Sequence, residues 1–449
     1  LAKLFEDSGK RTGSFLAANP AAFVVPHAGL TYSGTVAASA YRHLAAAPPE
    51  RVVLLGFTHR GAAPGAWIPD IEGFATPLGA VPIDRETVAE LTATGAFQLL
   101  PESALCDHSV EIQLPLLQKA APEARIVPVY VSHLDADARL GLARVLAGLA
   151  QPGTIFLASS DFTHYGRSFS YQPFPVDEWV AERLQGLDDA AIDAAGSLSP
   201  ELFLGTLRKS SSTVCGYEPV ALLLETLRLL DGESELFQEK LDYRTSGEIT
   251  GDFHHSVSYA ALGYFPAASF ELARDDQELL LESARHTLRH YLDTGKRKTI
   301  PPARRTPALE RRAPLFVTLT MNGELRGCVG RRATQDPLFD AVPQVTLSSA
   351  LEDSRFEPVS RDEREIDVEI SVLTPMKRIA DLSAFRVNEH GAVLDAGVHH
   401  GLLLPQVATE RGWSAAQFFD ALARKTAVRG EIYRDPATHV SVFRAQIIR

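Results

Sequence analysis

Short apolar runs alternate with amphipathic segments across the first half of the chain. Runs of three to five apolar residues bounded by Gly, Pro or Ser are typical of buried parallel strands, and apolar residues recurring every three or four positions predict helices. The predicted strands cover 23–25, 51–55, 126–130 and 154–158, and the predicted helices cover 34–46, 85–92, 110–120 and 136–149. This alternation predicts an α/β domain with a mostly parallel sheet covered by helices on both faces.

The pattern changes beyond residue 264. A last apolar strand is predicted at 257–265, and a helix follows at 271–292. Two alternating segments then flank Asn322-Gly323, a dipeptide typical of two-residue hairpin turns. The strands predicted in this half are 315–321, 324–330, 366–373, 391–396 and 401–404, with a helix at 415–425. The second half is therefore predicted to be an α+β domain with an antiparallel sheet.

Length and charge support two domains. A chain of 449 residues exceeds what one hydrophobic core ordinarily holds, so we expect domains at 1–266 and 270–449 that fold independently. Residues 1–265 carry 18 Lys and Arg against 31 Asp and Glu, a net of −13, whereas residues 266–449 carry 26 against 25. The acidic first half argues against nucleic acid as a partner.

Other features of the composition favour a cytoplasmic protein. Three cysteines cannot form a disulfide framework, which suggests a reducing compartment. No stretch approaches the ~18 uninterrupted apolar residues of a membrane span, and the first residues have no signal-peptide core. We therefore expect a cytoplasmic protein without a membrane partner.

Reactive side chains follow three of the predicted strands. His27, His59 and the pair Asp161 and His164 each come just past the end of one. In open α/β sheets, sites form in the crevice beyond the carboxyl ends of the strands, so these residues suggest a metal or acid/base site. His164 could act with Asp161 as an acid/base pair or as an extra ligand. The alternative is structural: each His closes a turn or satisfies the core, and Asp161 caps a helix.

Cys215 is a candidate third ligand beside His27 and His59. Imidazole and thiolate suit Zn, Fe or Cu, and three protein ligands leave room for water or substrate. Cys215 precedes a helix predicted at 220–230, and a helix N-terminus lowers the pKa of a thiol. Two alternatives stay open: Cys215 is a small buried hydrophobe, or Cys106 is the ligand instead.

His108 is a further candidate. It lies between Asp107 and Ser109, and either of these could cap the helix predicted at 110–120. His108 would then lie at the positive end of that helix. A functional role and a purely structural role both stay open for it.

Six segments of the first half occur in a recognisable order. They are VVPHAGLTYSG (24–34), LLGFTHRG (54–61), DHSVEIQLPLL (107–117), SSDFTHYG (159–166), TVCGYEPV (213–220) and HSVSYAALGYF (255–265). Together they resemble the Memo family over about residues 20–265. That family is similar in fold to the LigB-like class III extradiol dioxygenases, which are non-haem iron enzymes.

The resemblance implies a site and a metal. The implied metal ligands are His27, His59 and Cys215. Asp161 and His164 would line the same pocket, with His108 close by, and these three are our candidate catalytic residues. The dioxygenases use a carboxylate as third ligand, so Cys215 argues against ring cleavage. The implied metal is Fe(II), and Cu or Zn also suits these ligand types.

The second half resembles the AMMECR domain over about residues 272–449. The matching segments are LFVTLTMNGELRGCVGR (315–331), SALEDSRFEPVSRDE (349–363), VEISVLTPM (368–376) and GLLLPQVATERGW (401–413). Within the hallmark LRGCVG (325–330), Arg326 could hold an anion and Cys328 could be a nucleophile. Gly327 and Gly330 would allow a bulge or a close backbone approach. A packed strand with structural glycines is the alternative.

Memo-type and AMMECR-type domains occur beside a radical SAM protein in the grouping called AmmeMemoRadiSam, and this chain resembles a fusion of its parts B and A. The sequence holds no C-x3-C-x2-C motif for an iron–sulfur cluster. Our first hypothesis is a metal-dependent oxidoreductase that acts on O2 or an organic substrate. The alternatives are a non-catalytic metal-binding partner of a radical SAM enzyme and a Zn-dependent hydrolase. Its expected partners are the radical SAM protein and a small-molecule or peptide substrate.

Overall fold

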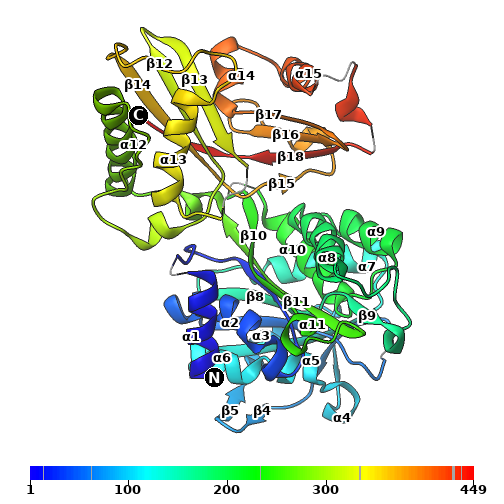
Figure 1. Ribbon diagram of the computed structural model, residues 1–449. Helices are drawn as coiled ribbons and strands as arrows, with labels where there is room; N and C mark the ends of the chain where they lie inside the picture. The colour runs from blue at the N-terminus through cyan, green and yellow to red at the C-terminus, as the bar shows by residue number, and fades with distance from the viewer. Residues whose placement is uncertain (14, 62, 233, 333–334, 427–429, 436) are drawn as a thin grey trace. The chain divides into compact units, whose positions relative to one another are not determined.

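The structure, a computed structural model, describes residues 1–449 except 14, 62, 233, 333–334, 427–429 and 436 (Figure 1). The chain divides into two units. The first comprises Leu1–Thr12 and Ala17–Ser269, and the second comprises Gly13–Leu16 and Phe270–Arg449. Independent folding of the two predicted domains stays a prediction.

The first unit is an α/β structure built on a mixed, mostly parallel sheet. Its strand order is β10-β11-β1-β8-β2-β7-β3-β6, and β9 pairs with β11. The parallel centre consists of β1 (Ala22–Val25), β8 (Thr154–Ser159), β2 (Arg51–Gly56) and β7 (Arg125–Ser132). The remaining strands are β3 (Gly65–Pro69), β6 (Gln98–Leu100), β9 (His164–Gly166), β10 (Leu236–Thr245) and β11 (His255–Pro266), and β4 (Gly73–Thr76) pairs with β5 (Gly79–Pro82). The four predicted parallel strands are confirmed.

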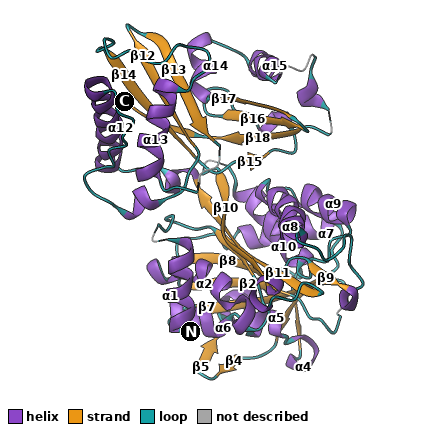
Figure 2. Ribbon diagram, viewed as in Figure 1, coloured by secondary structure: helices purple, strands orange, loops and turns teal. Residues whose placement is uncertain are grey.

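Two groups of helices pack in this unit (Figure 2). One contains α1 (Ala2–Thr12), α2 (Leu30–Ala46) and α6 (Leu114–Ala120), and α2 packs on β1, β10 and β11. The other contains α7 (Ala136–Ala147), α8 (Val180–Gly196), α9 (Pro200–Ser210) and α10 (Tyr217–Leu230), and α10 packs on β2, β7 and β8. The shorter or peripheral helices are α3 (Arg85–Ala93), α4 (Glu102–Leu105), α5 (His108–Glu111) and α11 (Ser246–Thr250). Every residue of β1 is buried, which explains its uninterrupted apolar run.

One predicted helix is divided. The sequence predicted a single helix over 110–120, but the structure has α5 and α6 there. Pro115 lies in the first turn of α6, where a missing amide hydrogen costs least. Helix α5 begins at His108, after the capping residue Asp107.

The second unit is an α+β structure with two antiparallel sheets, ordered β13-β12-β14-β19 and β15-β18-β16-β17. The strands are β12 (Leu315–Met321), β13 (Glu324–Arg331), β14 (Ile366–Leu373), β15 (Lys377–Arg378), β16 (Gly391–Ala396), β17 (His399–Leu403), β18 (His439–Phe443) and β19 (Ala445–Ile448). The helices are α12 (Arg274–Thr294), α13 (Leu338–Leu351), α14 (Pro405–Arg411) and α15 (Ala415–Lys425). The predicted hairpin is confirmed, with Asn322 and Gly323 both at positive φ in its turn.

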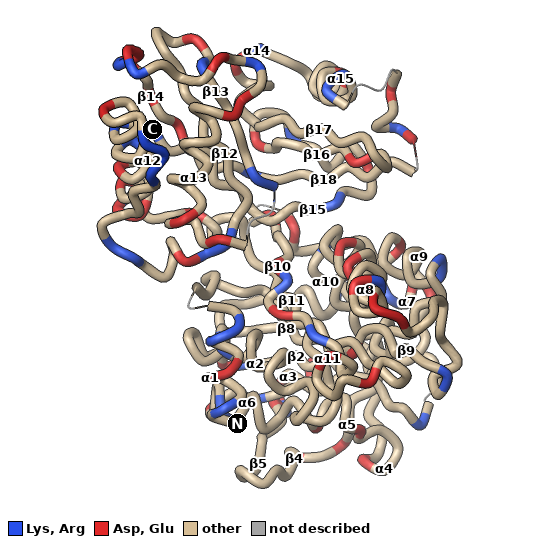
Figure 3. The backbone as a smooth tube through the Cα atoms, in the orientation of Figure 1, with Lys and Arg blue, Asp and Glu red and all other residues tan. Residues whose placement is uncertain are grey.

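The acidic excess of the first unit is spread over several elements, including α8 with Glu182, Asp188, Asp189 and Asp193 (Figure 3). Among the described residues, no helix combines the length and the apolar character that a bilayer crossing requires.

Candidate metal centre

The carboxyl ends of β1, β8 and β2 carry the side chains that the sequence singled out. These strands are direct neighbours in the sheet. His27 follows β1, Asp161 follows β8 and His59 follows β2. The crevice expected at the end of a parallel sheet therefore holds residues that are far apart in the sequence.

His27 lies at the centre of this group. Its side chain is buried, and its Nε2 lies 3.2 Å from Sγ of Cys215. Its backbone amide donates to Oδ1 of Asp161 at 2.8 Å, and its Nδ1 lies 3.0 Å from Oγ of Ser159. Burial, aided by the imidazoles of His108, His59 and His164, lowers the pKa of His27 to about 3. His27 is therefore neutral at physiological pH, the form that ligates metals.

A buried series of hydrogen bonds connects the His27 side chain to Ser159, Gln113 and Tyr41. Nε2 of Gln113 donates to Oγ of Ser159 at 3.0 Å and to the Pro26 carbonyl at 2.9 Å, and Tyr41 donates to Oε1 of Gln113 at 2.9 Å. When Ser159 also accepts the Nδ1 hydrogen of His27, Nε2 keeps its lone pair free for a metal. The supporting role of Gln113, Ser159 and Tyr41 was not predicted from the sequence, although Gln113 and Ser159 lie inside the segments that carry the Memo resemblance.

Asp107 lies beside two histidines. Its Oδ1 lies 2.9 Å from Nδ1 of His59 and 3.3 Å from Nδ1 of His108, and its Oδ2 accepts the His59 amide at 3.1 Å. Asp107 also caps α5 through the Ser109 amide, which confirms one of the two predicted caps. Burial alone would raise the pKa of Asp107, but the hydrogen bonds from Ser109 and His59 outweigh it and lower this pKa. Asp107 therefore stays ionised as a partner for both imidazoles.

Cys215 is held close to the end of β8. A Cβ atom on the next residue, Gly216, would overlap the Ser159 carbonyl and lie 2.6 Å from Cβ of Ser160, so only glycine permits this approach. Burial, followed by the charge of Asp161, raises the pKa of Cys215. The predicted lowering by the helix N-terminus is wrong for the metal-free thiol, because lost hydration outweighs the helix end. A bound cation would favour the thiolate.

Asp161 and His164 occupy the loop after β8. Asp161 is buried and accepts the amides of His27 and Ala28 rather than capping a helix, and burial raises its pKa. Nδ1 of His164 lies 3.0 Å from the carbonyls of both Phe162 and Thr213. With its Nδ1 hydrogen directed to these carbonyls, His164 carries its ring lone pair on Nε2.

The described residues contain two groups that could hold a metal ion. One is His27, His59 and His108, and the other is His27, Asp161 and Cys215. Within each group the ligand atoms lie within 4.8 Å of one another. The predicted ligands His27, His59 and Cys215 are thus divided between the two groups, and His27 belongs to both. Cys106 is in neither, and burial raises its pKa to about 11.

Comparison with known proteins identifies both units. The family model described as Memo-like protein matches residues 1–263, more than half of the chain. The chain belongs to the Memo-like protein family. A second family model, AMMECR1, matches residues 281–448. The protein is therefore a fusion of a Memo-like and an AMMECR1 domain.

Relatives of this Memo-like chain come from distant organisms. The memo-1 homolog of Caenorhabditis elegans is 32% identical over 270 residues, which cover 58% of this chain and 75% of that protein. MEMO1 of Homo sapiens is 31% identical over 249 residues, covering 54% and 84%. A protein of Methanothermobacter thermautotrophicus is 39% identical over 183 residues, covering 39% and 95%. A solved structure of an uncharacterized protein from Pyrococcus horikoshii shares 33% identity over 39% of this chain and 92% of its own, with a TM-score of 0.38.

In the AMMECR1 domain of this Memo-like protein, the LRGCVG motif lies on β13. Arg326 donates from Nε and Nη2 to Glu363 at 2.6 and 2.9 Å and from Nη1 to the Glu357 carbonyl at 2.9 Å. The guanidinium that sequence analysis offered to an anion is thus already held by a carboxylate. This ion pair raises the pKa of Arg326 and lowers that of Glu363.

Arg355, rather than the motif residue Arg326, is the cation beside Cys328. Its amide donates to Asp353 at 2.8 Å, and Oγ1 of Thr318 lies 3.4 Å from its Sγ. Arg355 donates to both oxygens of Asp353 and to the Cys328 carbonyl. Asp353 first, and Cys328 after it, raise the pKa of Arg355. Sequence analysis missed Arg355 because its contact with Cys328 depends on how the loop after α13 folds.

The two motif glycines are sites of close packing. A Cβ atom on Gly327 would overlap the Ser349 carbonyl of α13, and one on Gly330 would overlap the Phe316 ring. We expect Gly327→Ala to lower the free energy of unfolding of the second unit by about 2–3 kcal/mol, since a backbone carbonyl cannot rotate away. Chemical denaturation of the whole chain measures this. Gly186→Ala on α8 is the control, because its added Cβ meets nothing within 4 Å. An unchanged stability for Gly327→Ala would contradict the packing role.

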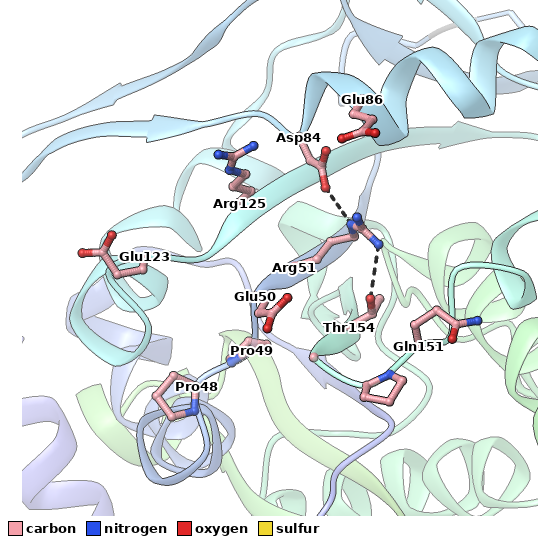
Figure 4. Close-up of a pocket in the computed structure, with 12 residues that line it drawn as sticks. Pro48, Pro49, Glu50, Arg51, Asp84, Glu86, Glu123, Arg125, Gln151 and Thr154 are labelled. Carbon is pink, nitrogen blue, oxygen red and sulfur yellow. Dashed lines mark hydrogen bonds and ion pairs between the residues drawn. The ribbon is translucent and has the colours of Figure 1, made fainter.

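A hollow of about 590 Å³ lies at the other end of the parallel strands from the candidate metal centre (Figure 4). Arg51, Arg125 and Thr154 line it, and each is the first residue of a parallel strand. Arg51 donates to Asp84 at 2.7 Å and to Thr154 at 3.5 Å. The hollow therefore lies at the amino ends of the strands, away from the edge where open α/β sheets form their sites.

Proposed function

We propose that the Memo-like domain binds Fe(II) in the crevice around His27 and is a metal-dependent redox enzyme. The observation that carries this proposal is the position of His27, a buried neutral imidazole that belongs to both groups of candidate ligands. Imidazole and thiolate ligands suit Fe, Cu and Zn, whereas Mg and Ca prefer oxygen ligands.

The surroundings of the ligands fit a metal. Metal-binding histidines usually donate their second ring nitrogen to a carboxylate, a carbonyl or another fixed acceptor. His59 has Asp107 in that role, and His27 has Ser159, which Gln113 holds in place. These contacts orient both imidazoles before any ion arrives.

The residues around the ligands support proton chemistry. When bound, Fe(II) would supply redox chemistry toward O2 or an organic substrate. His164 keeps Nε2 available to take or donate a proton, because two backbone carbonyls hold its Nδ1. Asp161 fixes the backbone of His27 and contributes a buried carboxyl whose pKa is raised. His164 would therefore be the proton-transferring residue, with Asp161 positioning His27.

A second candidate is a non-catalytic metal-binding partner of a radical SAM enzyme. The observation that favours it is the presence of Memo-like and AMMECR1 domains in a single chain, since the grouping that this chain resembles pairs such domains with a radical SAM protein. A Zn-dependent hydrolase at the same ligands is the third candidate.

Anaerobic metal loading distinguishes these functions. The full chain is loaded with Fe(II), desalted and assayed for bound iron, then for O2 consumption with a panel of catechols and peptides. Stoichiometric iron with O2 consumption above that of free iron supports the redox enzyme. Stoichiometric iron without turnover favours the partner role, and selective retention of Zn with hydrolysis favours the hydrolase. His286→Ala, which removes an exposed histidine of the second unit, controls for adventitious surface binding. Failure to retain any metal contradicts all three.

A further inference from the structure

His59 and His108 both lie beside Asp107. Nδ1 of His59 is hydrogen-bonded to Oδ1 of this carboxylate at 2.9 Å, and Nδ1 of His108 lies 3.3 Å from the same oxygen. A carboxylate oxygen can accept both Nδ1 hydrogens. Each ring then carries its free lone pair on Nε2, the arrangement by which a carboxylate prepares a histidine for a metal.

The rings also face the same neighbour. The imidazoles of His59 and His108 stack at 4.3 Å with 16° between their planes, so they run nearly parallel. Each meets the His27 ring almost at right angles, with centroids 5.6 Å apart. The ligand atoms of the three rings lie within 4.8 Å of one another. The three imidazoles thus form a group that could hold one metal ion.

We propose that His108 is a metal ligand, so that His27, His59 and His108 together bind a first-row divalent ion. This inference rests on the proposed metal binding and deepens it, because the Memo resemblance implies only two histidine ligands. Asp107 is then the positioning residue for two of the three. Three imidazoles still leave coordination positions for Cys215, water or a substrate.

His164 provides the contrast. Its Nδ1 also has acceptors, but it belongs to neither ligand group among the described residues. His108 instead lies at the mouth of the crevice, with 58% of its side chain exposed against 39% for His59. Replacing such an exposed side chain removes little packing, so its variants should fold.

Co(II) titration of the full chain tests the assignment, with visible absorption as the readout. We expect His108→Ala to bind Co(II) more weakly by about 100-fold or more, beyond the usual cost of losing an outer-shell partner. His133→Ala is the matched control, because His133 is also exposed and also lies beside a carboxylate, 3.5 Å from Glu218. The control should keep wild-type affinity.

A second variant gives a gain of signal. His108→Cys would place a thiolate on the ion, so the Co(II) complex should gain sulfur-to-metal charge-transfer absorption that the His133→Cys variant lacks. Wild-type affinity for His108→Ala, or no new absorption for His108→Cys, overturns the assignment while metal binding stands. Failure of the wild-type chain to bind Co(II) or Fe(II) contradicts the proposed function itself, so the two failures are distinguishable.

Discussion

The His27→Ala variant is expected to lose metal binding almost completely, with an affinity loss well above the ~100-fold that an outer-shell substitution costs. His27 is the one residue shared by both ligand groups. Its removal leaves two residues in each group, whichever of them holds the ion. Cys215→Ala and His59→Ala each remove a ligand from one group only. The variant that binds the metal more weakly identifies the group that contributes more to metal affinity.

Equilibrium dialysis with Fe(II) or Co(II), followed by metal analysis, measures these affinities. His27 is buried and hydrogen-bonded to Ser159, so its loss also removes packing. His27→Gln keeps most of the volume and a polar atom, and thermal unfolding of the metal-free variants checks that the fold survives. A folded His27 variant that retains wild-type affinity would place the metal outside this crevice.

The second large effect is expected for His164. The His164→Ala variant should keep its metal, because the structure places His164 outside both ligand groups of the described residues. If the protein is a redox enzyme, turnover should fall by ~10²-fold or more, the usual scale for loss of a general acid or base. Asp161→Asn should reduce turnover less, since Asp161 acts through the backbone amides of His27 and Ala28.

Metal content and O2 consumption are measured on the same preparations. His255→Ala is the control, because His255 is exposed and contacts Ser168 and Phe169 rather than the ligands. Thr213→Val should produce a smaller loss than His164→Ala. Oγ1 of Thr213 accepts a hydrogen bond from the backbone amide of His164, so this substitution leaves the His164 imidazole in place. Loss of metal from His164→Ala would return this residue to the ligand set. Unchanged turnover would exclude it as the proton-transferring group.

The part of the site that follows from strand order was predictable from the sequence. Parallel strands buried on both faces leave uninterrupted apolar runs, and the residues after them meet at one edge. This reasoning brought His27, His59 and Asp161 together correctly. The direction of the pKa shift at Cys215 could not be predicted in this way. The desolvation that raises this pKa depends on side chains that come from elsewhere in the fold.

The missed features share the same origin. Gln113 reaches Ser159 and Tyr41 from separate elements, and no local pattern records such contacts. Strand β10 was not predicted because a bulge between Lys240 and Asp242 interrupts its alternation. In the second unit, the hairpin at Asn322-Gly323 was predictable because a two-residue turn specifies its own register.

The shared imidazole of His27 imposes a rule of exclusion on the whole crevice. One nitrogen lone pair cannot serve two ions at once, and Nδ1 of His27 is engaged with Ser159. The nitrogen-rich group toward His59 and the sulfur-containing group toward Cys215 therefore either share one ion or compete for His27. Two ions that each require His27 would displace one another, so only one of them could use this imidazole at a time.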